Sequence, residues 1–254
     1  MDKYSEILSS FGTQETLNPE IWDDVESDEP KLKPQIRKAL LMIAGEFMDY
    51  LGDDLFVDDV RFTGSLANFN WSKFSDIDLH LYVDFSQFDV EDVEVYKELF
   101  QLKKTLFNTT HNITVKGFDV ELYAEDIDES HFSSGVYSVM FDTWVHNPEK
   151  ENVKIDKEML LSKTNSMMSQ IDSIIEDAEG ENYDKSVKRL DTFKDRLKKF
   201  RSSGLEKDGE FSYENLVFKF LRRNGYIQKL FDFKNKLIDK NLSISIYNNL
   251  YFSV

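Results

Sequence analysis

The chain has 254 residues, of which 41% are hydrophobic and none is cysteine, and its formal net charge is −17 at pH 7. This length exceeds the roughly 100 to 150 residues of a common single domain and predicts two domains, while the apolar content excludes a disordered chain. The lack of cysteine excludes disulfides and thiolate ligands, so a bound metal would be held by oxygen or imidazole donors, which favours Mg²⁺ or Mn²⁺.

The first part of the chain has the pattern of an α/β domain. Residues 1–30 are polar and acidic and are predicted to form a lead-in with little regular structure. A helix is predicted from Gln35 to Leu51, because apolar residues recur at helical spacing before Gly52. Strands are then predicted over Leu55–Thr63, Asp76–Phe85 and Ile113–Tyr123, with a helix over Asp92–Phe107. This order predicts a small mixed sheet in a domain of residues 1–150.

The second part changes to long helical stretches, which predict a separate helical domain over residues 151–254. The predicted helices are Met159–Ala178, Tyr183–Arg201 and Tyr213–Lys240, divided by turns at Glu179–Glu181, Ser202–Gly204 and Lys207–Gly209. The charge follows the same division, since residues 1–150 carry a net charge of −19 and residues 151–254 carry +2. The acidic total therefore does not exclude a polyanionic partner for the helical part.

The apolar segments of the chain are short. The longest apolar run, Ala39 to Ala44, is far below the ~20 residues that a membrane-spanning helix needs. The N-terminus also lacks a basic region followed by an apolar stretch. We therefore expect no membrane partner and a cytoplasmic location.

Residues 62–81 hold the side chains that best indicate chemistry. Gly64 and Ser65 follow a predicted strand and precede a possible short helix, where backbone N–H groups and the Ser65 hydroxyl could receive phosphate oxygens. Asp76 and Asp78 lie two residues apart in a strand, so both carboxylates project from one face. Their charges repel, and a divalent cation bound to both would offset the repulsion. The alternative is a solvated acidic strand face.

A second acidic strand offers a third carboxylate. Asp119 and Glu121 share one face of a predicted strand, and the residues alone leave both open as the third metal ligand. Such a residue would complete a two-metal site that aligns an attacking hydroxyl with a phosphate, or it would accept the proton of that hydroxyl.

Two further side chains near the aspartates are weaker candidates. Lys73 could reach a triphosphate oxygen as a point charge, although a lysine on a loop is more often merely exposed. His80 lies on the strand face of the aspartates, but the four histidines of the chain have no ligand spacing such as His-x-x-x-His. We expect them to be mostly structural.

This ordered set resembles the signature of the DNA polymerase β-like nucleotidyltransferase superfamily. That signature is a hydrophobic residue before Gly-Ser, a short spacer, Asp-x-Asp between hydrophobic residues, and later a lone carboxylate. The match covers residues 62–123. The resemblance implies a polymerase β-like fold in which Gly64 and Ser65 bind the β- and γ-phosphates, Asp76 and Asp78 bind the metals, and Asp119 or Glu121 binds the catalytic metal. The stretches Ser134–Ser138 and Gly209–Lys219 resemble predicted nucleotidyltransferases of large tailed phages, which implies the cytoplasm of a host cell.

The activity that the resemblance implies is transfer of a nucleoside monophosphate from an NTP to an acceptor hydroxyl, with release of pyrophosphate. Between Lys185 and Lys240 there are 16 Lys/Arg against 8 Asp/Glu, and this excess favours RNA, such as the 3′ end of a tRNA, as the acceptor. Lys188, Arg189 and Lys198 are the candidate acceptor contacts, and solvated helical faces are the alternative.

Other functions stay open at this point. The acceptor could instead be a small molecule or a second nucleotide. A rival of another class is a non-catalytic module that keeps the fold and binds a nucleotide or a protein.

Overall fold

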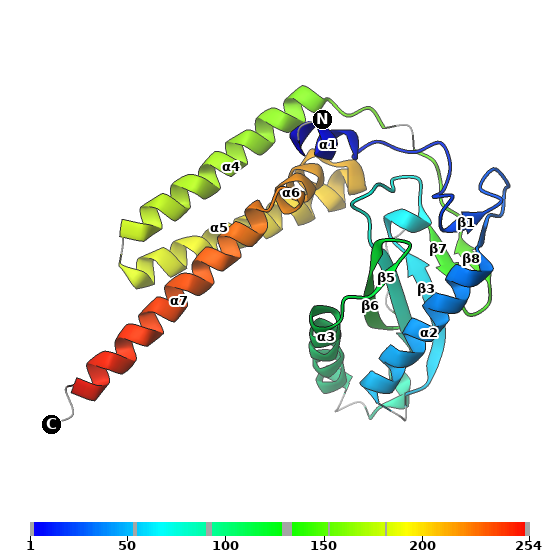
Figure 1. Cartoon of the computed structure of the whole chain (residues 1–254), viewed down its shortest axis with the longest axis horizontal. Helices are drawn as coiled ribbons and strands as arrows, with labels where there is room; N and C mark the ends of the chain where they lie inside the picture. Colours follow the sequence, from blue (N-terminus) through cyan, green and yellow to red (C-terminus); the bar gives the residue numbers. More distant parts are fainter. Residues whose placement is uncertain are drawn as a thin grey trace. The chain divides into compact units, whose positions relative to one another are not determined.

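The structure is a computed structural model that describes residues 3–52, 55–89, 93–128, 134–151, 153–180 and 182–251 (Figure 1). It divides into two compact units, which we call the sheet unit and the helical unit. The sheet unit is Gly12–Asn152, and the helical unit combines Met1–Phe11 with Val153–Val254. The chain therefore passes between the units near residue 152, but its first residues belong to the helical unit and not to the domain 1–150 in which we expected them.

The sheet unit is built on a six-stranded mixed sheet with the strand order β5-β6-β4-β3-β7-β8. The strands are β3 (Val57–Thr63), β4 (Ile77–Val83), β5 (Thr114–Val115), β6 (Phe118–Asp126), β7 (Val136–Ser138) and β8 (Thr143–His146). β4 and β6 are parallel, whereas the other neighbouring pairs are antiparallel. The predicted mixed sheet and α/β class are thus confirmed.

Two helices of the sheet unit pack on the sheet. α3 (Val93–Thr110) makes the crossover between the parallel strands β4 and β6 and packs on β6. α2 (Pro34–Leu51) packs on β4 and on α3, with the Phe47 ring 5.0 Å from the ring of Phe107. α2 begins at a proline, whose missing N–H is no loss in the first turn, and ends before Gly52. Both helices were predicted, although Asp92, at the start of the second prediction, lies outside the described residues.

The acidic lead-in contains more regular structure than predicted. It forms α1 (Lys3–Ser9) and a two-stranded sheet of β1 (Trp22–Asp23) and β2 (Lys31–Leu32). A few apolar side chains among the acidic residues account for this, because Ile7, Ile21 and Trp22 are almost fully buried. The prediction of little regular structure therefore missed α1 and β1.

The third predicted strand is a hairpin. β5 and β6 pair antiparallel around Lys116 and Gly117, both of which have positive φ, as a two-residue type I′ turn requires. The prediction of one continuous strand over residues 113–123 missed this turn. Strand β6 then continues to Asp126, beyond the predicted end.

The helical unit consists of α1 and four C-terminal helices: α4 (Lys157–Gly180), α5 (Tyr183–Asp208), α6 (Tyr213–Arg223) and α7 (Tyr226–Tyr251). α5 ends at Gly209, which has φ 70°, so the turn predicted there is confirmed. The turn predicted at Ser202–Gly204 is wrong, because α5 runs through it. Short helices Ser65–Ala67 (η1), Phe85–Gln87 (η2) and Gly209–Phe211 (η3) complete the description.

The helix predicted over Tyr213–Lys240 is two helices. α6 ends at Arg223, and α7 begins after Asn224 and Gly225, of which Gly225 has φ 85°. The turn predicted at Glu179–Glu181 was placed too early, because α4 continues through Glu179 and Gly180, and Glu181 lies outside the described residues. None of the helices in the described ranges is long and apolar enough to cross a membrane.

Candidate metal centre

Three carboxylates meet at one end of the two central parallel strands. Asp76 directly precedes β4, Asp78 is the second residue of β4, and Glu121 lies on β6. Asp78 and Glu121 are partners in the parallel register, so their side chains stand next to each other on the same face. One oxygen from each of the three half-buried carboxylates lies within 4.8 Å of the others.

Asp119 lies outside this group although it is on the same face of β6 as Glu121. Its pairing partner is Thr114 of the β5 hairpin, and its side chain is exposed. The reason is the register: Val120 is opposite Ile77, the first residue of β4, so Asp119 extends past the end of β4. The geometry therefore places Glu121, and not Asp119, with the aspartate pair.

Gly64 brings the Gly-Ser turn directly against this group. Thr63, the last residue of β3, pairs with Asp78, and Gly64 follows with φ 76° and ψ −164°. A Cβ atom on Gly64 would lie 1.9 Å from Oδ2 of Asp78. Any side chain at this position would clash with the Asp78 carboxylate, so only glycine fits here.

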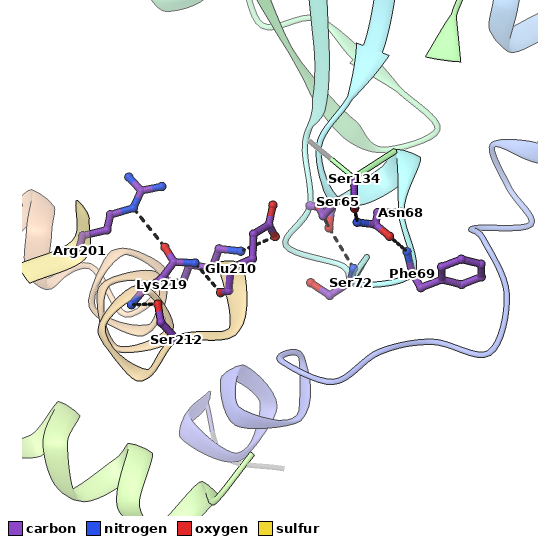
Figure 2. Close-up of polar contacts among 11 residues, drawn as sticks. Ser65, Asn68, Phe69, Ser72, Ser134, Arg201, Glu210, Ser212 and Lys219 are labelled. Atoms are coloured by element: carbon purple, nitrogen blue, oxygen red, sulfur yellow. Dashed lines mark hydrogen bonds and ion pairs between the residues drawn. The ribbon is translucent and has the colours of Figure 1, made fainter. Parts of the chain in front are cut away.

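Ser65 is tied to the loop that leads to the aspartates. Its hydroxyl donates to the hydroxyl of Ser75 (2.7 Å), which also accepts from the backbone N–H of Ser72 (2.9 Å). Figure 2 shows Ser65 beside Ser72, and it shows the Asn68 side chain between Ser134 and the backbone N–H of Phe69. These contacts hold residues 65–75 as one compact loop between the glycine turn and Asp76.

Lys73 is exposed on this loop. Its ammonium nitrogen lies 4.8 Å from the centre of the Phe74 ring, which is a cation–π contact with its chain neighbour. The structure thus places Lys73 on the loop that leads to Asp76.

Sequence reasoning missed a layer of side chains next to Glu121. The Tyr123 hydroxyl donates to Oε2 of Glu121 (2.6 Å), and the Lys104 ammonium on α3 lies 3.8 Å from the centre of the Tyr123 ring. Burial, the negative charge of Asp78 and the bond to Glu121 raise the pKa of Tyr123 far above its usual value. Alternation along β6 could have revealed Tyr123, but nothing in the local sequence of α3 indicated Lys104.

His80 belongs to the same layer. It is buried, it pairs with Tyr123 in the strand register, and the two rings stack with their centres 4.4 Å apart. Its Nδ1 atom lies 3.1 Å from Oε2 of Glu125. His80 therefore packs behind the carboxylates and is not a member of their group among the described residues.

Burial also affects Lys104. It lowers the pKa of the ammonium group, and the nearby carboxylates of Glu121, Glu125 and Asp78 oppose this effect. A half-buried cation therefore sits close to the acidic group and neutralises part of its charge.

Only two of the three candidate acceptor residues line the same groove. Lys188 and Arg189 line a groove between α4 and α5, whereas the exposed Lys198 is outside its lining. Farther along the helical unit, Arg201 donates to Asn215 (3.2 Å) and Lys219 lies 3.5 Å from Glu210 (Figure 2).

Comparison of the chain with protein-family models, with curated proteins and with solved structures gives no match. The function must therefore be argued from the residues of the site.

Proposed function

We propose that this chain is a metal-dependent nucleotidyltransferase that transfers a nucleoside monophosphate from an NTP to an acceptor hydroxyl. One observation carries the proposal: Asp76, Asp78 and Glu121 converge beside a glycine turn whose backbone touches Asp78. The resemblance to polymerase β-like enzymes supports it, since the converging residues are those that the signature marks.

The donor set suits Mg²⁺ or Mn²⁺. Carboxylate oxygens are the ligands that these hard cations prefer, and three carboxylates within 4.8 Å repel one another unless a cation lies among them. When bound there, such an ion would supply positive charge against the developing charge of the phosphates.

The remaining residues of the site have roles in holding the nucleotide and the ligands. Gly64 lets the backbone approach the triphosphate closely, and the Ser65 hydroxyl could donate to a phosphate oxygen by exchanging its present bond to Ser75 for one to the nucleotide. The Tyr123 hydroxyl fixes one oxygen of Glu121 and leaves the other to bind a metal or to accept the proton of the attacking hydroxyl. Lys73 would supply additional charge at the mouth of the site.

The first test is transfer of label from each of four α-³²P-labelled NTPs, with Mg²⁺ or Mn²⁺, with and without total RNA. Wild type is compared with Asp76→Ala/Asp78→Ala. We expect label in a product and release of pyrophosphate from wild type only. Label in RNA names the acceptor class, and a product formed without RNA identifies a nucleotide or a small molecule as the acceptor. No product under any condition, as in the double variant, would overturn the proposal.

A matched pair of variants on β6 tests the third carboxylate. Glu121→Gln should lower the transfer rate by at least about 100-fold, because it removes a ligand or a base. Asp119→Asn is two residues away on the same strand face and should retain nearly full activity. Equal loss in both variants would contradict the assignment of Glu121.

A further inference from the structure

The helical unit contains a groove of about 770 Å³ between α4 and α5. From α5 it is lined by Lys185, Lys188, Arg189 and Arg196, and from α4 by Ser166, Ser169 and Ser173. Among the described residues that line it there is no carboxylate. One side of the groove thus carries a row of cations and the other a row of hydroxyl groups, although the chain as a whole is strongly acidic.

Both arginines of the groove are oriented by side chains of α4. The Arg189 guanidinium lies 2.6 Å from Asp177, and that of Arg196 donates to the Gln170 amide oxygen (2.7 Å). A guanidinium held in this way loses less conformational freedom when it binds a phosphate.

The spacing of the groove residues fits an extended ligand. Lys185, Lys188, Thr192 and Arg196 follow one another at intervals of three or four residues along α5, so they lie on one side of the helix. At 1.5 Å per residue this row is about 16 Å long. The three serines of α4 recur with the same helical periodicity. A single phosphate would use only part of such a row.

We propose that this groove binds the sugar–phosphate backbone of single-stranded RNA. The cations match a chain of phosphates, and the serine hydroxyls can both donate to and accept from ribose 2′-hydroxyl groups, which a polycarboxylate lacks. The further statement that this RNA is the acceptor rests on the proposed function.

The test is fluorescence anisotropy of a labelled single-stranded RNA with the full-length protein, over a series of KCl concentrations and with EDTA present. Lys185→Gln/Lys188→Gln neutralises two cations of the groove. Lys199→Gln/Lys207→Gln makes the same change of charge at exposed positions of α5 outside the groove lining. All four side chains are exposed, so both variants should keep the fold.

The plot of log affinity against log salt has a negative slope. The groove variant should make this slope shallower by about 1.4, since each lost phosphate contact on a single strand contributes about 0.7. Near 0.1 M salt its affinity should fall on the order of tenfold, and that of the control should change little. Equal losses in both variants, no RNA binding by wild type, or equally tight binding of polyglutamate would overturn the proposal.

This experiment tests the proposal for the groove independently of the proposal for the metal centre. Groove-dependent RNA binding together with no transfer in any assay would support the groove and overturn the proposed function. Transfer to RNA that the groove variant leaves unchanged would overturn the statement that the groove binds the acceptor and would support the proposed function.

Discussion

Gly64 is the residue on which the geometry of the site most directly depends. Its combination of φ 76° and ψ −164° is essentially restricted to glycine, and Oδ2 of Asp78 occupies the space of a side chain. Gly64→Ala should therefore lower the free energy of unfolding by roughly 2 to 4 kcal/mol, from backbone strain and overpacking together.

Denaturant unfolding followed by tryptophan fluorescence measures this effect, because all three tryptophans lie in the sheet unit. Gly45→Ala is the matched control. Gly45 lies inside α2 with open space around it, so alanine there should stabilise the protein by about 0.5 to 1 kcal/mol. A similar gain for Gly64→Ala would contradict the crowding at Asp78.

The carboxylate group gives a second prediction at the residue scale. With EDTA present, Asp78→Asn should raise the free energy of unfolding by about 1 kcal/mol, because it removes one of three mutually repelling charges. The same change should abolish the stabilisation that Mn²⁺ gives the wild type, which is about 2.7 kcal/mol at 100 times the Kd. Thermal unfolding with and without Mn²⁺ measures both effects. Retention of the Mn²⁺ effect would count against the metal centre, and Asp119→Asn, which should retain it, is the control.

At the scale of elements, Gly204 was predicted to lie in a turn but lies in helix α5, where it permits close packing. It lies buried near the C-terminal end of α5, and a Cβ atom there would be 2.5 Å from Cβ of Glu214 and 2.8 Å from Oγ of Ser212. The Ser212 hydroxyl accepts from the backbone N–H of Asn215 and so caps α6. Glycine therefore allows the start of α6 to pack closely on α5.

Gly204→Ala tests this packing. Helix propensity alone would stabilise the variant by about 1 kcal/mol, but the clash with α6 should cost more, so we expect a net loss of about 1 to 2 kcal/mol. Unfolding followed by circular dichroism at 222 nm measures the helical unit, which contains no tryptophan. A net gain would show that α6 moves aside at little cost.

These elements show which parts of the fold could be predicted. α2 and the start of α4 follow from apolar periodicity, and β3 and β4 follow from β-branched and aromatic runs, because these signals are local. The break after Arg223 was missed because apolar residues lie on both sides of it. The hairpin turn at Lys116-Gly117 was missed because apolar residues, Val115 and Phe118, flank it. A glycine in a helix and a glycine in a turn have the same sequence signal; only the packing distinguishes them.

For the candidate site too, the sequence predicted the features that are local in the chain and missed those that depend on long-range packing. Asp76, Asp78 and the Gly-Ser turn lie close together in the chain, and their spacing indicated a metal site. The choice between Asp119 and Glu121 depends on which residue of β6 is opposite Asp78, and strand register is a long-range property. Lys104 reaches the same layer only through the packing of α3 on β6.

At the scale of the whole molecule, the two ends of the chain build one unit. Ile7 of α1 is fully buried, Tyr4 stacks on Phe220 of α6 (5.6 Å), and the Arg223 guanidinium donates to the Ser10 hydroxyl (2.6 Å). An N-terminal segment that precedes the sheet unit in sequence therefore stabilises the C-terminal helices.

Ile7→Ala should accordingly destabilise the helical unit by about 2 to 4 kcal/mol. We expect the midpoint measured by circular dichroism, to which the long helices contribute most, to fall while the tryptophan fluorescence midpoint changes little. Leu40→Ala, at a fully buried position of α2, should have the reverse effect and is the matched control. Equal shifts of both signals in both variants would show that the units unfold together.

The parallel pairing of Asp78 with Glu121 also determines which changes in chain length the site would tolerate. Insertions or deletions in the connection through α3 leave the strand register intact, since the connection has only to return the chain to the same edge of β4. Loss of a single residue at the start of β6 is different, because Leu122 would then lie opposite Asp78 in place of Glu121. Homologous chains should therefore differ freely in the length of the crossover, while the paired segments of β3, β4 and β6 should keep their length.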